Sequence, residues 1–88
     1  MSRSAQEIQD WMIDRLSRLT RIPAHKIDPR QPIRRLGLDS VALVAFVTDL
    51  MEWVGYRYTD NPLDDHPTLE GLAAFLAEDT AKDDERTG

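Results

Sequence analysis

The chain contains no cysteine among its 88 residues, and this absence excludes several kinds of chemistry. There is no disulfide framework, no thiolate nucleophile and no zinc–thiolate site. The two histidines, His25 and His66, have no second ligand at metal-binding spacing, so we predict no metal site. The lack of cysteine fits a protein of the reducing cytoplasm.

The chain also lacks a long hydrophobic run and an excess of positive charge. Its longest apolar run, 41–47, is too short to cross a membrane, and residues 1–10 lack the apolar core of a signal peptide. Sixteen acidic against eleven basic residues give a net charge of −5, which argues against a nucleic-acid partner. A chain of this length forms one small domain with little room for a catalytic cleft. We therefore predict a cytoplasmic, monomeric binding or carrying protein that is not an enzyme and contacts no membrane.

Three stretches have the apolar periodicity of amphipathic helices. A capping box over 4–7 predicts a first helix over 4–20. The second helix, over 40–54, has Asp39 as its N-cap and Gly55 as its stop, and Thr68 caps the third. The apolar positions of the first helix are Ile8, Met12, Leu16 and Leu19, those of the second are Leu43, Val47, Leu50 and Val54, and those of the third are Leu69, Leu72, Ala73 and Leu76.

Two loops separate these helices. The first loop, 21–39, has no sustained period, but its spaced apolar residues predict an ordered loop anchored to the helices by Ile22, Ile27, Ile33, Leu36 and Leu38. Residues 62–65 fit a short helical turn, and the charged segment 80–88 fits a disordered tail or linker after a domain of 1–79. The predicted fold class is all-α, a small four-helix bundle of three main helices and one short helix, with a long ordered first loop.

Ser40 lies where the first loop turns into the second helix. Backbone N–H groups at a helix start are unpaired and the helix dipole is positive there, so a phosphate ester on Ser40 would be favoured. Asp39 and Ser40 are also ordinary capping residues, and the pair alone fits a plain helix cap equally well.

Four blocks of the sequence resemble the acyl carrier protein family. Ile27-Asp28 and Ile33 lead into Leu36-Gly37-Leu38-Asp39-Ser40-Val41, which resembles the attachment motif of that family. Residues 46–55 resemble the rest of its second helix, and Asp65-His66-Pro67-Thr68 with Leu69 and Leu72 resembles the entry to its last helix. Together the blocks span about residues 5–78 in the family's order and spacing.

This resemblance implies that Ser40 carries 4′-phosphopantetheine, which a phosphopantetheinyl transferase moves from coenzyme A to the serine hydroxyl. The thiol of that arm would hold acyl groups as thioesters, so a chain without cysteine would use imported sulfur. Asp39 would be recognised by the transferase as well as capping the helix. Gly37 matches the family's small residue, where a larger side chain would crowd the approach to Ser40.

The exposed face of the second helix is the expected docking surface for partner enzymes. We assign to it Val41, Ala45, Thr48, Met51 and Glu52. Its low charge would make apolar contact matter more than electrostatic steering. The expected partners are the transferase and acyl-loading and acyl-processing enzymes such as a ligase, an acyltransferase or a ketosynthase.

Other interpretations stay open from the sequence. The segment Leu-Gly-Leu-Asp-Ser is similar to polyketide or fatty-acyl carriers, whereas peptidyl carriers of nonribosomal pathways more often show Gly-Gly-x-Ser. An unmodified helical interaction module is a further alternative. A serine hydrolase is disfavoured because the Gly-x-Ser-x-Gly pattern is absent. Arg30, Arg34 and Arg35 form a basic patch that is typical of a solvated surface; the alternative is that Arg34 and Arg35 contact an acidic partner or the phosphodiester on Ser40.

Overall fold

The computed structural model describes residues 3–55 and 62–87, and these parts of the chain are helical. The α-helices are α1 (Ala5–Thr20), α2 (Ser40–Val54) and α3 (Leu69–Thr87). Short 3₁₀ helices are η1 (Ala24–Lys26), η2 (Ile33–Leu36) and η3 (Pro62–Asp64). No strand occurs in these two ranges, which hold only an isolated bridge between Pro32 and Thr68. The predicted all-α class is thus confirmed for the described residues.

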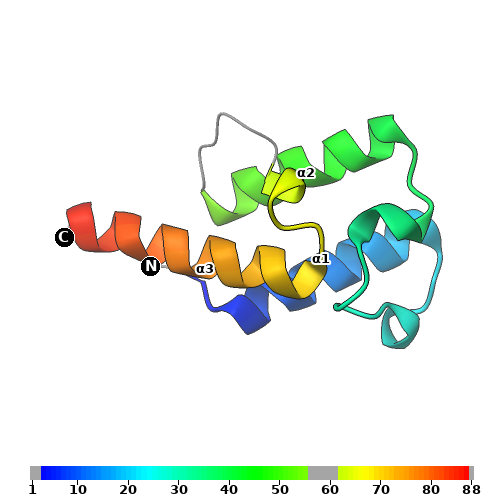
Figure 1. Ribbon diagram of the computed structural model, residues 1–88, viewed down its shortest axis with the longest axis horizontal. Helices are drawn as coiled ribbons and strands as arrows, with labels where there is room; N and C mark the ends of the chain where they lie inside the picture. The colour runs from blue at the N-terminus through cyan, green and yellow to red at the C-terminus, as the bar shows by residue number, and fades with distance from the viewer. Residues whose placement is uncertain (1–2, 56–61, 88) are drawn as a thin grey trace.

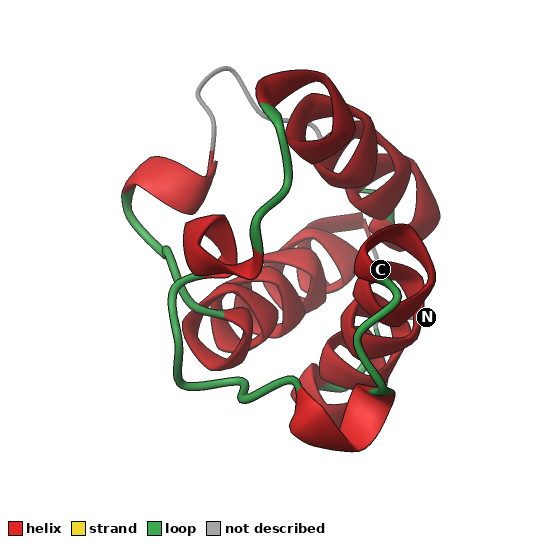
Figure 2. Cartoon of the chain, turned by 90° about the vertical axis from the view of Figure 1, so that its right-hand side faces the viewer, coloured by secondary structure: helices red, strands yellow, loops and turns green. Residues whose placement is uncertain are grey.

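The three α-helices run lengthwise through the molecule, and α1 points the opposite way from the other two. In Figure 1, α1 runs from left to right, whereas α2 and α3 run from right to left, and both chain ends lie on the left. Figure 2 looks onto the opposite end, where loops and short helices connect the α-helices. The start of α2, and with it Ser40, lies at this end, far from both chain ends.

Local signals in the sequence set the start of α1 and both ends of α2 as predicted. Ser4 and Glu7 form the capping box, with the Ser4 hydroxyl accepting from the Glu7 N–H at 3.1 Å. α2 begins after its N-cap Asp39 and ends at Gly55, whose φ of 76° is left-handed and whose N–H donates to the Met51 carbonyl at 2.9 Å.

The first loop is ordered by the anchors that its sequence predicts. Ile27 and Ile33 are buried, and the other three pack partly buried against the core: Ile22, Leu36 and Leu38. The Ser17 hydroxyl of α1 donates to the Ile22 carbonyl at 2.7 Å, which ties the start of the loop to the helix. The sequence did not predict the turns η1 and η2 within this loop.

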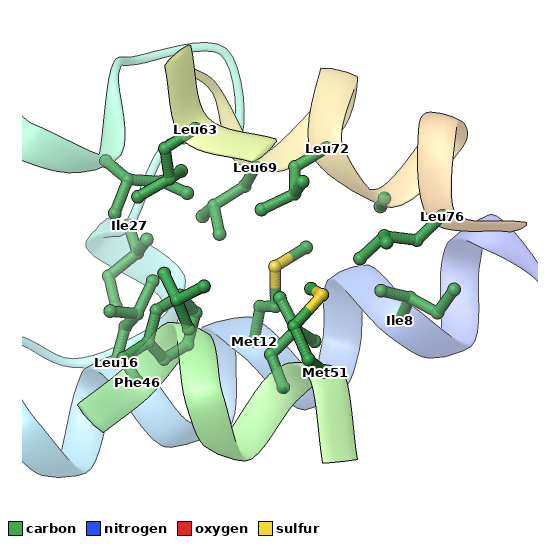
Figure 3. Packing of buried hydrophobic residues seen from close by; sticks show 14 residues of the cluster. Ile8, Met12, Leu16, Ile27, Phe46, Met51, Leu63, Leu69, Leu72 and Leu76 are labelled. Carbon is green, nitrogen blue, oxygen red and sulfur yellow. The ribbon is translucent and has the colours of Figure 1, made fainter. Parts of the chain in front are cut away.

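One core joins all three helices. Among the described residues it contains Ile8, Met12, Leu16, Ile27, Ile33, Phe46, Val47, Leu50, Met51, Leu63, Leu69, Leu72, Ala73 and Leu76. In Figure 3 the leucines of α3 face Ile8 and Met12 of α1, and Met51 of α2 points into the same cluster. The predicted stripe of α3 is confirmed, and the Thr68 hydroxyl accepts from the Gly71 N–H at 3.0 Å, as its capping role requires.

The prediction that Leu19 is a core position was wrong. Leu16 is the last buried residue of α1, and Leu19, in the final turn, is 45% exposed. Leu19 has the right angular position on the helix, but it lies beyond the part of α1 that the core covers. Periodicity fixes the direction of a side chain and not the depth at which it lies.

Two further expectations differ from the structure in detail. The short fourth helix corresponds to the single 3₁₀ turn η3, so the four-helix count stays a prediction. The backbone of residues 80–87, expected to be a disordered tail, continues α3, and Thr80 is buried with its hydroxyl donating to the Leu76 carbonyl at 2.7 Å. The division into a domain of 1–79 and a linker of 80–88 also stays a prediction.

Candidate functional site

Ser40 is exposed and is the first residue of α2. The preceding residue, Asp39, is the N-cap, and its carboxylate accepts a hydrogen bond from the Ala42 N–H at 2.7 Å. The Asp39 carbonyl accepts from the Leu43 N–H at 2.9 Å, which is the first bond of the helical ladder. Asp39 therefore provides the cap, and the Ser40 hydroxyl is left at the surface beside the positive helix start.

Gly37 makes the turn that brings the chain from η2 to Asp39. Its φ is 85°, in the left-handed region where residues with a Cβ are strained. No heavy atom lies within 4 Å of the position that a Cβ would take. Within the chain itself Gly37 is thus needed for its backbone conformation, and any crowding by a larger residue would concern an approaching molecule.

The loop that carries Gly37 is fastened to the start of α3 by its backbone. The Ile33 N–H donates to the Pro67 carbonyl at 2.8 Å, and the Glu70 N–H donates to the Pro29 carbonyl at 2.9 Å. An exposed ion pair joins Arg34 of η2 to Asp64 of η3 at 3.3 Å. These contacts hold the segment before Ser40 against the start of the third helix. The loop that leads into Ser40 is therefore ordered.

The Arg34–Asp64 pair also bears on the basic patch seen in the sequence. It gives Arg34 an intramolecular carboxylate partner, so this arginine is not simply a solvated cation. Arg30 and Arg35 are exposed. His66, the other residue of interest in this region, stacks on Phe75 with ring centroids 4.3 Å apart, which agrees with a structural role.

The predicted docking face is exposed at four of its five positions. Val41 is 79% exposed, and Ala45, Thr48 and Glu52 are also exposed. Met51 does not belong to this face, because it is only 4% exposed and lies in the core (Figure 3). It follows Val47 by four residues and therefore shares the buried side of α2.

Sequence reasoning missed Val44 as a candidate surface residue. Val44 is 62% exposed and lies one helical turn after Ser40. Its position four residues after the serine was a signal that could have placed it on the same side of α2. Val41 and Val44 are therefore large exposed apolar side chains close to Ser40.

The geometry agrees with a covalently attached, negatively charged group at the start of α2. The hydroxyl of Ser40 is accessible, the helix start favours a phosphodiester, and Gly37 adds no side chain to the approach. The fold and the site agree with a small helical domain that displays an accessible serine at the start of α2, as a carrier domain does.

Comparison with known proteins identifies the family. Residues 10–76 match the family described as "Phosphopantetheine attachment site", and the chain belongs to this family. It is a non-catalytic carrier domain to which 4′-phosphopantetheine is covalently attached. None of the described helices is both long and apolar enough to span a lipid bilayer.

Of two sequence relatives, one is an acyl carrier protein and the other is a large synthase that contains a segment similar to this chain. The chain is 30% identical over 74 residues to the acyl carrier protein TtuC of Teredinibacter turnerae, covering 84% of this chain and 85% of that protein. It is 33% identical over 64 residues to one of the phenolphthiocerol/phthiocerol polyketide synthase subunits of Mycobacterium tuberculosis. That alignment covers 73% of this chain but only 3% of the synthase.

A solved structure shares the fold. A free-standing peptidyl carrier protein from an uncharacterized secondary metabolic pathway of Acinetobacter baumannii superposes with a TM-score of 0.75. The match covers 86% of this chain and 95% of that chain, at 24% sequence identity. The likeness concerns the three-helix architecture.

Proposed function

We propose that Ser40 is the residue of this chain that carries 4′-phosphopantetheine. The supporting observation is its position: an exposed serine, first in α2, preceded by a capping aspartate. The other described serines have different roles, since Ser4 caps α1 and Ser17 donates to the Ile22 carbonyl.

The residues around Ser40 have separate tasks in this proposal. Asp39 fixes the first turn of α2 and presents a carboxylate for recognition by the transferase. Gly37 and the fastened loop hold the serine in one place relative to the helix. When attached, the arm supplies a terminal thiol that holds acyl groups as thioesters, and its flexibility lets one group reach several enzymes.

The exposed face of α2 is the proposed docking surface. It comprises Val41, Ala45, Thr48 and Glu52, to which the structure adds Val44. Two exposed valines close to Ser40 support recognition that depends on apolar contact. The expected partners are the phosphopantetheinyl transferase and acyl-loading or acyl-processing enzymes such as a ligase, an acyltransferase or a ketosynthase.

We further propose that the cargo is an acyl group of polyketide or related natural-product biosynthesis. The sequence relatives support this choice, because one is named as an acyl carrier protein and the other belongs to a polyketide synthase. A peptidyl carrier is the second candidate, favoured by the fold of the Acinetobacter protein alone. A monomeric state and a cytoplasmic location stay predictions.

Attachment is tested by incubating the purified chain with coenzyme A and a promiscuous phosphopantetheinyl transferase, followed by intact-mass measurement. The wild type is expected to gain the mass of one phosphopantetheine, and Ser40→Ala is expected to gain none. Ser4→Ala is the matched control, because Ser4 is also an exposed serine at a helix start. It is expected to be modified like the wild type.

Two outcomes would contradict the proposal. A wild-type chain that gains no mass would speak against the carrier function. A Ser40→Ala chain that still gains the mass would place the attachment at another residue.

A further inference from the structure

An open groove between α1 and α2 lies outside the core and away from Ser40. It has a volume of about 360 Å³ and is lined by Trp11, Arg15, Asp49, Glu52 and Trp53. We call it the tryptophan groove. Its lining combines flat aromatic rings with charged side chains, a combination that none of the roles described above explains.

The aromatic part of the groove is a stack that reaches from the core to the surface. Trp11 and Trp53 lie nearly parallel, with ring centroids 4.9 Å apart and an interplanar angle of 13°. Trp11 also lies 6.3 Å from the ring of Phe46, which is buried. Both tryptophans are half-buried, so the stack packs against the core on one side and reaches solvent on the other.

The chain itself places two guanidinium groups on these rings. The guanidinium carbon of Arg3 lies 4.0 Å from the centroid of Trp53, and that of Arg15 lies 4.8 Å from the centroid of Trp11. Both distances are within the range of about 6 Å in which a cation is attracted to the face of an aromatic ring. Both tryptophan rings therefore already carry a guanidinium: Arg15 is part of the groove lining, and Arg3 lies on the Trp53 ring without being one of the lining residues.

The two arginines are held differently. Arg15 also donates to the Asp49 carboxylate at 3.1 Å, which fixes it between α1 and α2. Arg3 precedes α1 and, among the described residues, contacts the groove through the Trp53 ring without an ion pair or hydrogen bond. Arg3 is thus the group that another cation can replace.

The charge of the groove favours such a cation. Asp49 shares its charge with Arg15, whereas Glu52 is exposed and forms no ion pair within the described part of the chain. The whole chain carries a net charge of −5, which adds to the attraction. A planar guanidinium matches a flat ring better than a lysine ammonium does, because it can stack on the ring as well as carry charge.

From these contacts we infer that the Trp53 ring, on the α2 side of the tryptophan groove, binds an arginine side chain of a partner protein, which takes the place of Arg3. The groove shares Glu52 with the proposed docking face of α2 and extends that face towards α1. The inference rests on the proposed function only in that a docking partner supplies the arginine. The binding site itself does not depend on modification of Ser40.

The groove is tested by titrating the unmodified chain with N-acetyl-argininamide and following the indole N–H signals of Trp11 and Trp53 by NMR. The wild type is expected to bind the probe weakly. Arg3→Ala is expected to bind it about two- to fivefold more tightly, because it removes a competing cation–π contact of the usual strength. In the Arg3→Ala background, Glu52→Gln is expected to weaken binding because it removes the rim carboxylate without touching the stack.

Matched controls separate the groove from general charge attraction. N-acetyl-citrullinamide has nearly the same shape without the charge and is expected to leave both signals unshifted. Glu70→Gln removes another exposed carboxylate, from α3, which contributes no residue to the groove, and is expected to leave binding unchanged.

The inference is overturned if the probe shifts neither indole signal in the Arg3→Ala chain, or if the citrulline compound shifts them equally. It is also overturned if binding is insensitive to both Arg3 and Glu52. Because Ser40→Ala is expected to bind the probe like the wild type, failure of the groove and failure of the attachment proposal give different results.

Discussion

At the scale of single residues, Asp39 and Ser40 have different roles that the sequence alone does not separate: one caps the helix and the other presents a hydroxyl at the surface. Both residue types are good helix caps, and the structure gives the capping role to Asp39 through its bond to the Ala42 N–H. Ser40 is therefore available at the surface as the first helical residue. A carboxylate that caps the helix can also be read by a partner, and these two roles of Asp39 are separable by substitution.

We expect Asp39→Ala to lower the free energy of unfolding by about 0.5–2 kcal/mol, because the Ala42 N–H loses its acceptor. Asp39→Asn keeps a capping oxygen, so its stability is expected to stay close to that of the wild type. Both variants are expected to be modified more slowly by the transferase if the charge is recognised. Urea denaturation measures the change in stability, and the rate of mass gain measures the modification. If Asp39→Asn is modified at the wild-type rate, the recognition role is refuted.

Prediction of single residues from the sequence succeeded where a local signal sets the backbone structure. It failed where the burial depth of a side chain decides its exposure. Asp39, Gly55 and the Ser4 capping box act on neighbouring backbone groups, so the sequence alone locates them. Met51 and Leu19 were misplaced because their exposure depends on what covers each helix. Met51 shares the side of Val47 and is covered by the core, whereas Leu19 lies beyond the core.

At the scale of elements, the first loop determines where α2 starts. Its apolar anchors could be read from the sequence, but its hydrogen bonds to residues around the start of α3 could not, because they join segments more than thirty residues apart. The left-handed turn at Gly37 then directs the chain into the helix. Gly55 has a similar conformation at the other end of α2, which provides a matched comparison.

Gly37→Ala and Gly55→Ala are each expected to lower the free energy of unfolding by about 1–2 kcal/mol, the usual cost of a left-handed residue with a Cβ. The costs should be similar, because φ is 85° at one site and 76° at the other and neither new Cβ meets an atom within 4 Å. Only Gly37→Ala is expected to slow modification of Ser40, since only Gly37 lies beside it. Equal modification rates for the two variants would show that Gly37 has a backbone role alone.

At the scale of the whole molecule, one small core stabilises everything that the site depends on. The described core draws residues from all three α-helices, the first loop and η3. Small domains have free energies of unfolding of only about 5–15 kcal/mol, so the loss of one well-packed side chain is a large fraction of the total. A pair of leucines on α1 distinguishes the covered part of the helix from the uncovered part.

Leu16→Ala is expected to lower the free energy of unfolding by about 2–5 kcal/mol, because Leu16 is fully buried. Leu19→Ala, three residues later on the same helix, is expected to lower it by about 1 kcal/mol or less because Leu19 is 45% exposed. Both variants remove the same atoms from the same type of residue. Denaturant unfolding followed by circular dichroism measures the difference, and equal losses would contradict the placement of Leu19 outside the core.

The opposed positions of Ser40 and the two chain ends have a practical consequence. Since both ends lie at one pole of the molecule and α2 starts at the other, a tag, a fluorescent label or a solid support joined to either end would lie behind the serine (Figure 1). A chain anchored at either end would present Ser40 on the side that faces away from the support. Immobilised arrays of this domain would therefore keep every serine open to enzymes in solution.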